Sequence, residues 1–175
     1  MFLGLDIGTS GVKAVVTGEN GEVLAQNSAD LAVSRPFPLW SEQAPDDWVA
    51  ATHQAVLGID PALRRGVRGV GLAGQMHGAT LLGADDRPLR AAILWNDGRS
   101  FAECAELEAA QPQSRAITGN IMMPGFTAPK LAWVRRHEPD VFSAVRSVLL
   151  PKDYVRLALT GDKASDMSDS AGTLW

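Results

Sequence analysis

The chain has 175 residues, of which 46% are hydrophobic and 21% charged, values typical of a single globular domain. Sixteen basic and twenty acidic side chains give a net charge of −4, and no run of basic residues is present, which argues against a nucleic-acid or anionic-membrane partner. The single cysteine, Cys104, excludes an intrachain disulfide. Residues 1–10 do not resemble a signal peptide, and no apolar stretch approaches the roughly 18 residues of a spanning helix, so we expect a cytoplasmic protein.

The first thirty residues predict three short strands joined by tight turns. Residues 2–7 are apolar and precede Gly8, residues 12–16 alternate in polarity, and residues 23–27 follow an Asn20-Gly21 turn signal. The first is expected to be a buried strand. Because there is no room for a crossover helix between them, we expect an antiparallel meander.

Helices and strands then alternate, which predicts a mixed α/β sheet flanked by helices. A helix should begin at Pro45 and place Trp48 and Ile59 on its apolar face. A capping-box pattern, Ser100 to Glu103, predicts a second helix. The further expected elements are a buried strand at 67–72, strands at 79–82, 91–95 and 148–150, the second helix ending near residue 110, a helix with Pro129 in its first turn, and a helix at 152–159 ended by Gly161.

The segment Asp6-Ile7-Gly8-Thr9-Ser10-Gly11-Val12-Lys13 is the first candidate for chemistry. Backbone N–H groups of a glycine-containing turn can hold phosphate oxygens, the hydroxyls and Lys13 add donors, and Asp6 could hold Mg²⁺ through water. The segment has the spacing of neither a P-loop nor a dinucleotide-binding motif. The alternative interpretation is a polar hairpin turn with an incidental aspartate.

A second candidate, Gly74-Gln75-Met76-His77-Gly78, follows the strand predicted at 67–72. Ligands bind at the carboxyl ends of strands in open α/β sheets. Gln75 and His77 could bind sugar hydroxyls, with Met76 as an apolar wall. Alternatively, His77 is merely a hydrogen-bonded loop residue.

The third candidate, Trp95-Asn96-Asp97-Gly98-Arg99, also lies where a strand ends. Trp95 could lie against the C–H face of a sugar, with Asn96, Asp97 and Arg99 available for hydroxyls. The alternative is a core tryptophan followed by an Asx-type turn.

Together these segments resemble a known family. The hairpin from Asp6 to Lys13 resembles the first phosphate-binding hairpin of the sugar kinase, Hsp70 and actin superfamily. Residues 125–137, with Lys130 and Trp133 three apart, are similar to the first signature of the FGGY carbohydrate kinases. Within that family, the Met76-His77 loop resembles the sugar-binding loop of the members that phosphorylate D-xylulose, and Gly125 stands where glycerol-phosphorylating members carry a tyrosine.

The resemblance implies a ribonuclease H-like domain of the actin, hexokinase and Hsp70 type. It implies ATP-dependent phosphorylation of D-xylulose to D-xylulose 5-phosphate. The implied roles are Asp6 holding Mg²⁺ through water, Gly8, Thr9, Ser10 and Lys13 facing the ATP phosphates, and Gln75, Met76, His77, Trp95 and Asn96 around the sugar.

Family members are well over twice this length, so residues 1–175 are interpreted as an incomplete N-terminal domain, without the second actin-like domain and the aspartate that acts as general base. We therefore expect the isolated chain to be inactive. The alternatives are an FGGY kinase for another ketose or polyol and a non-catalytic sugar-binding fragment. The expected partners are D-xylulose and ATP, with no nucleic acid or membrane, and a homodimer is compatible with the resemblance.

Overall fold

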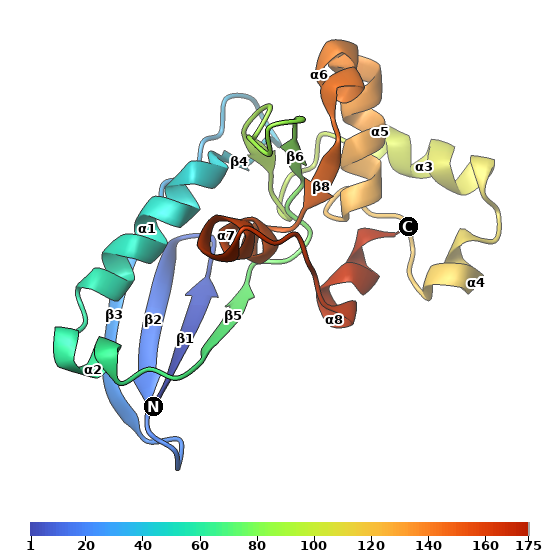
Figure 1. Ribbon diagram of the computed structural model, residues 1–175. Coiled ribbons are helices and arrows are strands. Elements are labelled where there is room, and N and C mark those ends of the chain that lie inside the picture. The colour runs from blue at the N-terminus through green and yellow to red at the C-terminus, as the bar shows by residue number, and fades with distance from the viewer. Residues whose placement is uncertain (175) are drawn as a thin grey trace.

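A four-stranded mixed sheet opens the computed structural model, which describes residues 1–174 (Figure 1). Strands β1 (Phe2–Ile7), β2 (Gly11–Thr17) and β3 (Val23–Asp30) form the predicted antiparallel meander. Strand β5 (Val70–Gly74) pairs in parallel with β1, so the strand order is β3-β2-β1-β5. The turn between β2 and β3 contains Gly21 with φ +83°, which agrees with the Asn-Gly signal.

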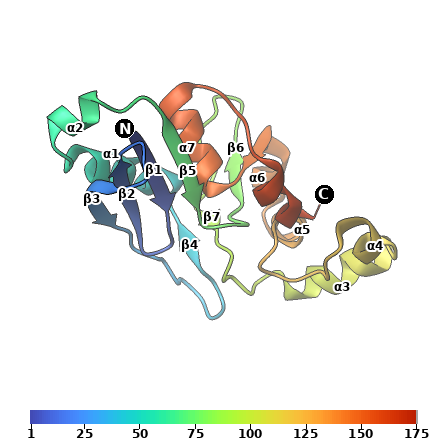
Figure 2. The same ribbon diagram turned by 90° about the horizontal axis from the view of Figure 1, so that it is seen from below.

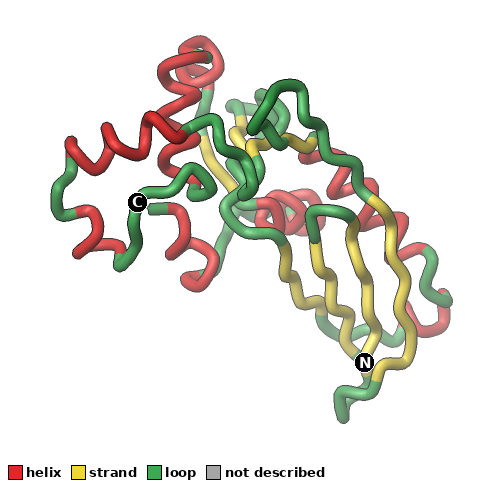
Figure 3. Tube along the Cα trace, turned by 180° about the vertical axis from the view of Figure 1, so that it is seen from behind, coloured by secondary structure: helices red, strands yellow, loops and turns green. Residues whose placement is uncertain are grey.

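Two helices, α1 (Pro45–Leu57) and α7 (Pro151–Thr160), cover one face of this sheet. Alternate residues of β1, namely Leu3, Leu5 and Ile7, point toward these helices into the main core, which also contains Trp48. In Figure 3 the opposite face carries no helix from the part of the chain that the structure describes.

Two predictions about burial were therefore wrong. β1 is buried on one face only, so Asp6 is exposed rather than at the end of a buried strand. β5 begins at Val70 instead of residue 67, and Val70 itself is 54% exposed. β5 is exposed because it lies at the edge of the sheet, with its outer face uncovered by residues 1–174.

A second part of the molecule is built on two short antiparallel strand pairs. These pairs are β4 (Glu42–Gln43) with β7 (Ala92–Ile93), and β6 (Thr80–Leu82) with β8 (Ser147–Leu149). Helices α5 (Thr127–His137) and α6 (Pro139–Ala144) follow one another beside them (Figure 1). A smaller core, which includes Leu81, Ile93, Trp133 and Val134, fills the space between β6, β7 and α5. The strands predicted at 79–82 and 91–95 are thus present but shorter, and the strand predicted at 148–150 is present with the same length but begins one residue earlier, at Ser147.

The remaining helices are short, apart from α3. They are α2 (Pro61–Arg65), α3 (Phe101–Ala110), α4 (Ser114–Thr118), α8 (Met167–Ser170) and the 3₁₀ turn Ala171–Thr173. In Figure 2, α3 and α4 project away from the four-stranded sheet. The predicted capping box is absent, because the Ser100 hydroxyl donates to the carbonyl of Pro124 (3.3 Å) instead of capping α3. Within residues 1–174, no helix combines the length and the apolar character that crossing a membrane requires.

Candidate active site

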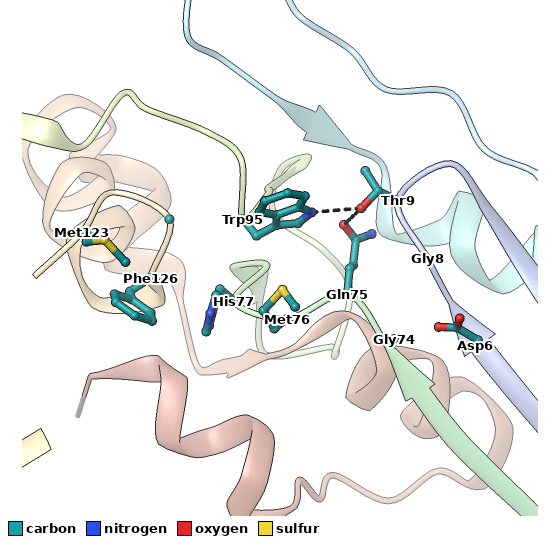
Figure 4. Close-up of a pocket in the computed structure, with 11 residues that line it drawn as sticks. Asp6, Gly8, Thr9, Gly74, Gln75, Met76, His77, Trp95, Met123 and Phe126 are labelled. Carbon is teal, nitrogen blue, oxygen red and sulfur yellow. Dashed lines mark hydrogen bonds between the residues drawn. The ribbon is translucent and has the colours of Figure 1, made fainter. Parts of the chain in front are cut away.

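A cavity of about 520 Å³ lies where β1 and β5 end, and it is the candidate site (Figure 4). The pairing of Ile7 with Gly74 brings the carboxyl ends of these parallel strands together, and the N–H of Gln75 donates to the carbonyl of Ile7 (2.8 Å). The two loops that carry the first and second candidate segments therefore meet at one edge of the sheet. The lining residues are Asp6, Gly8, Thr9, Gly74, Gln75, Met76, His77, Trp95, Met123, Gly125 and Phe126.

Most of the predicted site residues line this cavity, but three do not. Ser10 lies at the exposed tip of the turn between β1 and β2. Lys13 is exposed on β2, where it is the cross-strand partner of Asp6. Asn96 is exposed beside Trp95, outside the cavity.

The turn that the sequence predicts to bind phosphate is a tight hairpin, and the backbone N–H of Gly8 in it is already hydrogen-bonded. The N–H of Gly8 donates to the carbonyl of Gly11 (3.0 Å), which closes the turn around Thr9 and Ser10. That N–H is consequently engaged within the turn. The exposed carboxylate of Asp6 and the exposed side chains of Ser10 and Lys13 remain open to a ligand.

Thr9 connects the hairpin to both other candidate segments. Its hydroxyl donates to Oε1 of Gln75 (3.0 Å) and accepts from Nε1 of Trp95 (3.0 Å), as Figure 4 shows. Because its proton is donated to Gln75, the hydroxyl has no second proton for a phosphate oxygen. Thr9 therefore ties the walls of the cavity together in this structure.

Gln43 extends this chain of hydrogen bonds into the core. Its Nε2 donates to the backbone carbonyl of Thr9 (2.7 Å), and its Oε1 accepts from Nε2 of Gln75 (2.9 Å) and from Nε1 of Trp48 (2.9 Å). Gln43 and Gln75 are 3% and 6% exposed, so both amides are committed to protein partners. Gln75 thus holds the site together and also lines the cavity, and its contact with sugar hydroxyls stays a prediction.

His77 has an unusual backbone and an unpaired ring nitrogen. Its φ is +63°, a conformation that L-residues adopt only when their surroundings enforce it. The ring packs edge-on against Phe126, with 4.7 Å between centroids, and its Nδ1 is buried without a hydrogen-bond partner among the described residues. Burial, and secondarily the nearby Lys130, lower the pKa of His77, which keeps the imidazole neutral at pH 7. A neutral ring can donate from one nitrogen and accept at the other.

The third candidate segment divides into two parts with different surroundings. Trp95 is 44% exposed and lines the cavity, so it is not a core tryptophan. Asp97 is buried, and its carboxylate accepts from the N–H groups of Ser41 (2.6 Å) and Arg99 (2.9 Å), the second of which forms an Asx-type turn. Arg99 pairs with Asp97 and lies 3.6 Å from the ring centroid of Trp40. Asp97 and Arg99 are therefore structural, and the expectation that they serve hydroxyls was wrong.

The opposite wall of the cavity is formed by Met123, Gly125 and Phe126, of which sequence reasoning singled out Gly125 through the family resemblance and missed Met123 and Phe126. Gly125 lies so close to Trp95 that a Cβ atom there would be 2.6 Å from the Trp95 carbonyl oxygen. The signal for this wall was present in the position of Gly125 at the start of the signature segment, but nothing in the local pattern indicates which part of the fold it faces. Gln43 was missed as a site residue for a similar reason, since its role depends on side-chain contacts across the fold.

The family is established by comparison with known proteins. The model of the N-terminal domain of the FGGY family of carbohydrate kinases matches residues 1–175. The chain belongs to the FGGY family of carbohydrate kinases.

Within this family the chain is similar to xylulose kinases. It is 60% identical to the xylulose kinase of Escherichia coli (strain K12) and 41% identical to that of Bacillus subtilis (strain 168), covering 100% and 98% of this chain. Only 36% and 35% of those relatives are covered, so the chain spans about a third of their length.

Solved structures give the same result for the fold. The xylulose kinase from Rhodospirillum rubrum superposes with a TM-score of 0.93 at 30% identity, over 99% of this chain and 36% of that one. A Plasmodium falciparum glycerol kinase with ADP, at 20% identity, superposes with a TM-score of 0.87 over 99% of this chain and 37% of that one. The predicted α/β fold of the actin-like ATPase type is thereby confirmed.

Proposed function

We propose that the complete protein transfers the γ-phosphoryl group of ATP to a hydroxyl of D-xylulose, and that residues 1–175 supply its sugar- and phosphate-binding half. The observation that carries this proposal is that one cavity contains both the Met76-His77 loop and the Asp6–Gly8 end of the hairpin. A phosphoryl acceptor and a phosphoryl donor must lie next to one another for in-line transfer. The 60% identity to a xylulose kinase supports D-xylulose as the acceptor.

The sugar side would be formed by His77, Met76 and Trp95. The neutral imidazole can accept a hydrogen bond from a sugar hydroxyl or donate one to it, and the position of His77 in the cavity lining supports such a role. Met76 and Trp95 are 45% and 44% exposed in the cavity, and they offer apolar surfaces to the C–H groups of a sugar. Asn96 would bind at the rim, since it lies outside the cavity lining.

The phosphate side would be formed by Asp6 with the hairpin and Lys13. Mg²⁺ keeps several waters and binds phosphates together with one or two carboxylates, so an exposed aspartate that faces the cavity fits an ion held through water. Mg²⁺ would neutralise charge on the phosphates. Gly8 and Ser10 would approach the phosphates through the turn, while Lys13 would contribute a positive charge beside Asp6.

The acceptor hydroxyl must lose a proton during transfer. Among residues 1–174, Asp6 is the single carboxylate that lines the cavity, and we assign it to the metal side. We therefore propose that the general base, and most of the adenine site, belong to a second actin-like domain of the complete protein. Closure of two domains would exclude water from the phosphates.

We further place the protein in the cytoplasm, where ATP is available, and propose a homodimer as its assembly.

A sugar panel tests the proposed function. The complete protein is assayed with ATP and Mg²⁺ against D-xylulose, D-ribulose, L-ribulose, gluconate and glycerol, and ADP formation is followed. We expect the highest kcat/KM for D-xylulose. A clear preference for another acceptor would contradict the substrate, and phosphorylation of none of them would contradict the kinase assignment of this site.

A further inference from the structure

Lys130 on α5 is a fully buried lysine whose hydrogen bonds join two walls of the cavity. Its side chain is 0% exposed, and its ammonium group donates to the carbonyls of His77 (2.7 Å) and Gly125 (2.7 Å). Among the residues that the structure describes, no carboxylate lies within ion-pair distance of it. Burying an amine without a counter-ion is costly unless its hydrogen bonds are made, so these two carbonyls are what stabilises it there.

Because Lys130 is buried, it cannot contact the phosphates directly, which is the role usually given to a lysine near a phosphoryl-transfer site. Lys130 does not line the cavity, and its donors are directed at backbone carbonyls rather than at open space. Burial lowers the pKa of Lys130 to about 7, an effect that Asp97 opposes and Arg99 reinforces. Its neutral amine would still carry two N–H donors, enough for the same two carbonyls.

The first carbonyl belongs to the most constrained residue of the cavity. His77 has φ +63°, and its carbonyl also accepts from the hydroxyl of Thr127 (3.3 Å), in the first turn of α5. Thr127 and Lys130 are three residues apart, so they approach the carbonyl from one face of the helix. Hydrogen bonds from α5 therefore hold the backbone that determines where the His77 ring points.

The second carbonyl fixes the opposite wall. Gly125 packs against the Trp95 carbonyl oxygen so closely that a side chain cannot be accommodated there. By binding the carbonyls of Gly125 and His77 at once, Lys130 connects the segment with Phe126 to the loop with His77. Both segments line the cavity.

We propose that Lys130 is a positioning residue for the sugar, which sets the distance between the His77 loop and the Gly125 segment without touching substrate. This inference rests on the proposed function, because it assigns His77 to the sugar side. It predicts that losing the amine impairs the use of sugar far more than the use of ATP, since the hairpin between β1 and β2 is held by Thr9 and Gln43 instead.

Lys130→Met in the complete protein tests this, because methionine keeps most of the volume and removes both donors. We expect the KM for the sugar to rise roughly ten-fold or more, and the KM for ATP to change much less. Thr127→Val removes the weaker of the two donors to the His77 carbonyl and should raise the sugar KM by about two- to five-fold. Val134→Ala, one turn further along α5 in the second core, is the control. It should lower the melting temperature without changing the sugar KM.

The inference is overturned if Lys130→Met changes the sugar KM no more than Val134→Ala does, or if it raises the KM for ATP equally. If Lys130→Met does not fold, Thr127→Val decides, and an unchanged sugar KM in that variant overturns the inference. The same kinetics on the unsubstituted protein distinguish a failure of this inference from a failure of the proposed function. If it prefers another sugar, D-xylulose fails as the substrate, and the variants are compared with the preferred sugar. If it phosphorylates no sugar, both fail.

Discussion

His77 brings together a positive φ, a neutral ring and a buried nitrogen without a partner. These properties give a direct prediction for His77→Ala in the complete protein. Losing a hydrogen bond to a sugar hydroxyl costs about 1–3 kcal/mol, so kcat/KM for D-xylulose should fall roughly 10- to 100-fold. ATP hydrolysis without sugar should be retained. His53→Ala, on the exposed side of α1, serves as the control. An unchanged kcat/KM in the His77 variant would remove His77 from the sugar site.

Asp6 differs from the other carboxylates of the described chain because it faces both the cavity and the open side of the sheet. For Asp6→Ala we expect sugar phosphorylation to be abolished, since the Mg²⁺ contact is lost, while D-xylulose still binds. Activity titrated against Mg²⁺ and calorimetry with the sugar measure the two effects. Asp30→Ala, at the exposed end of β3, is a matched carboxylate control. Near-normal turnover of the Asp6 variant at ordinary Mg²⁺ would refute the assignment.

At the level of the elements, the hairpin and the β5 loop are joined by the Thr9 hydroxyl. Thr9→Val keeps the shape and removes the bonds to Gln75 and Trp95. At about 1 kcal/mol for each bond, we expect the KM values for ATP and for sugar both to rise, by roughly five-fold if one bond matters and roughly thirty-fold if both do. Thr52→Val, which removes a buried hydroxyl from α1, should leave both KM values unchanged. A rise for only one substrate would show that Thr9 does not link the two sides.

The order of the elements could be predicted from the sequence, whereas their surroundings could not. Alternation and the Asn20-Gly21 turn indicate the meander, because these signals are local. Whether β5 is buried depends on which elements cover it, and Val70 is exposed for that reason. Likewise, Gln75 and Met76 are neighbours in sequence and both line the cavity, yet Gln75 is 6% exposed and hydrogen-bonded to Gln43, whereas Met76 is 45% exposed.

Considering the whole molecule, residues 1–174 place a single carboxylate, that of Asp6, in the cavity, and in the proposed function the general base lies elsewhere. We expect the 175-residue chain alone to show no measurable phosphorylation of D-xylulose and at most weak ligand binding. The isolated domain would make only part of the contacts with a ligand, and these must still offset the full loss of the ligand's translational and rotational freedom. A coupled assay with ATP, Mg²⁺ and D-xylulose measures this, with the complete protein as positive control. Turnover at an enzyme-like rate would mean that the general base lies within these residues.

The edge formed by β5 has a consequence for handling the domain in solution. The segment Val70-Gly71-Leu72-Ala73-Gly74 carries no charge or proline, and β1 is its one strand partner in the described sheet. Unpaired backbone N–H and C=O groups on such an edge form a template to which a second copy can add. We expect the isolated domain to self-associate with increasing concentration in light scattering. Val70→Lys should suppress this, whereas Leu57→Lys, which adds the same charge on α1, should not. Equal suppression by both would attribute the effect to net charge, and the purification of this domain would then depend on pH and salt rather than on the strand edge.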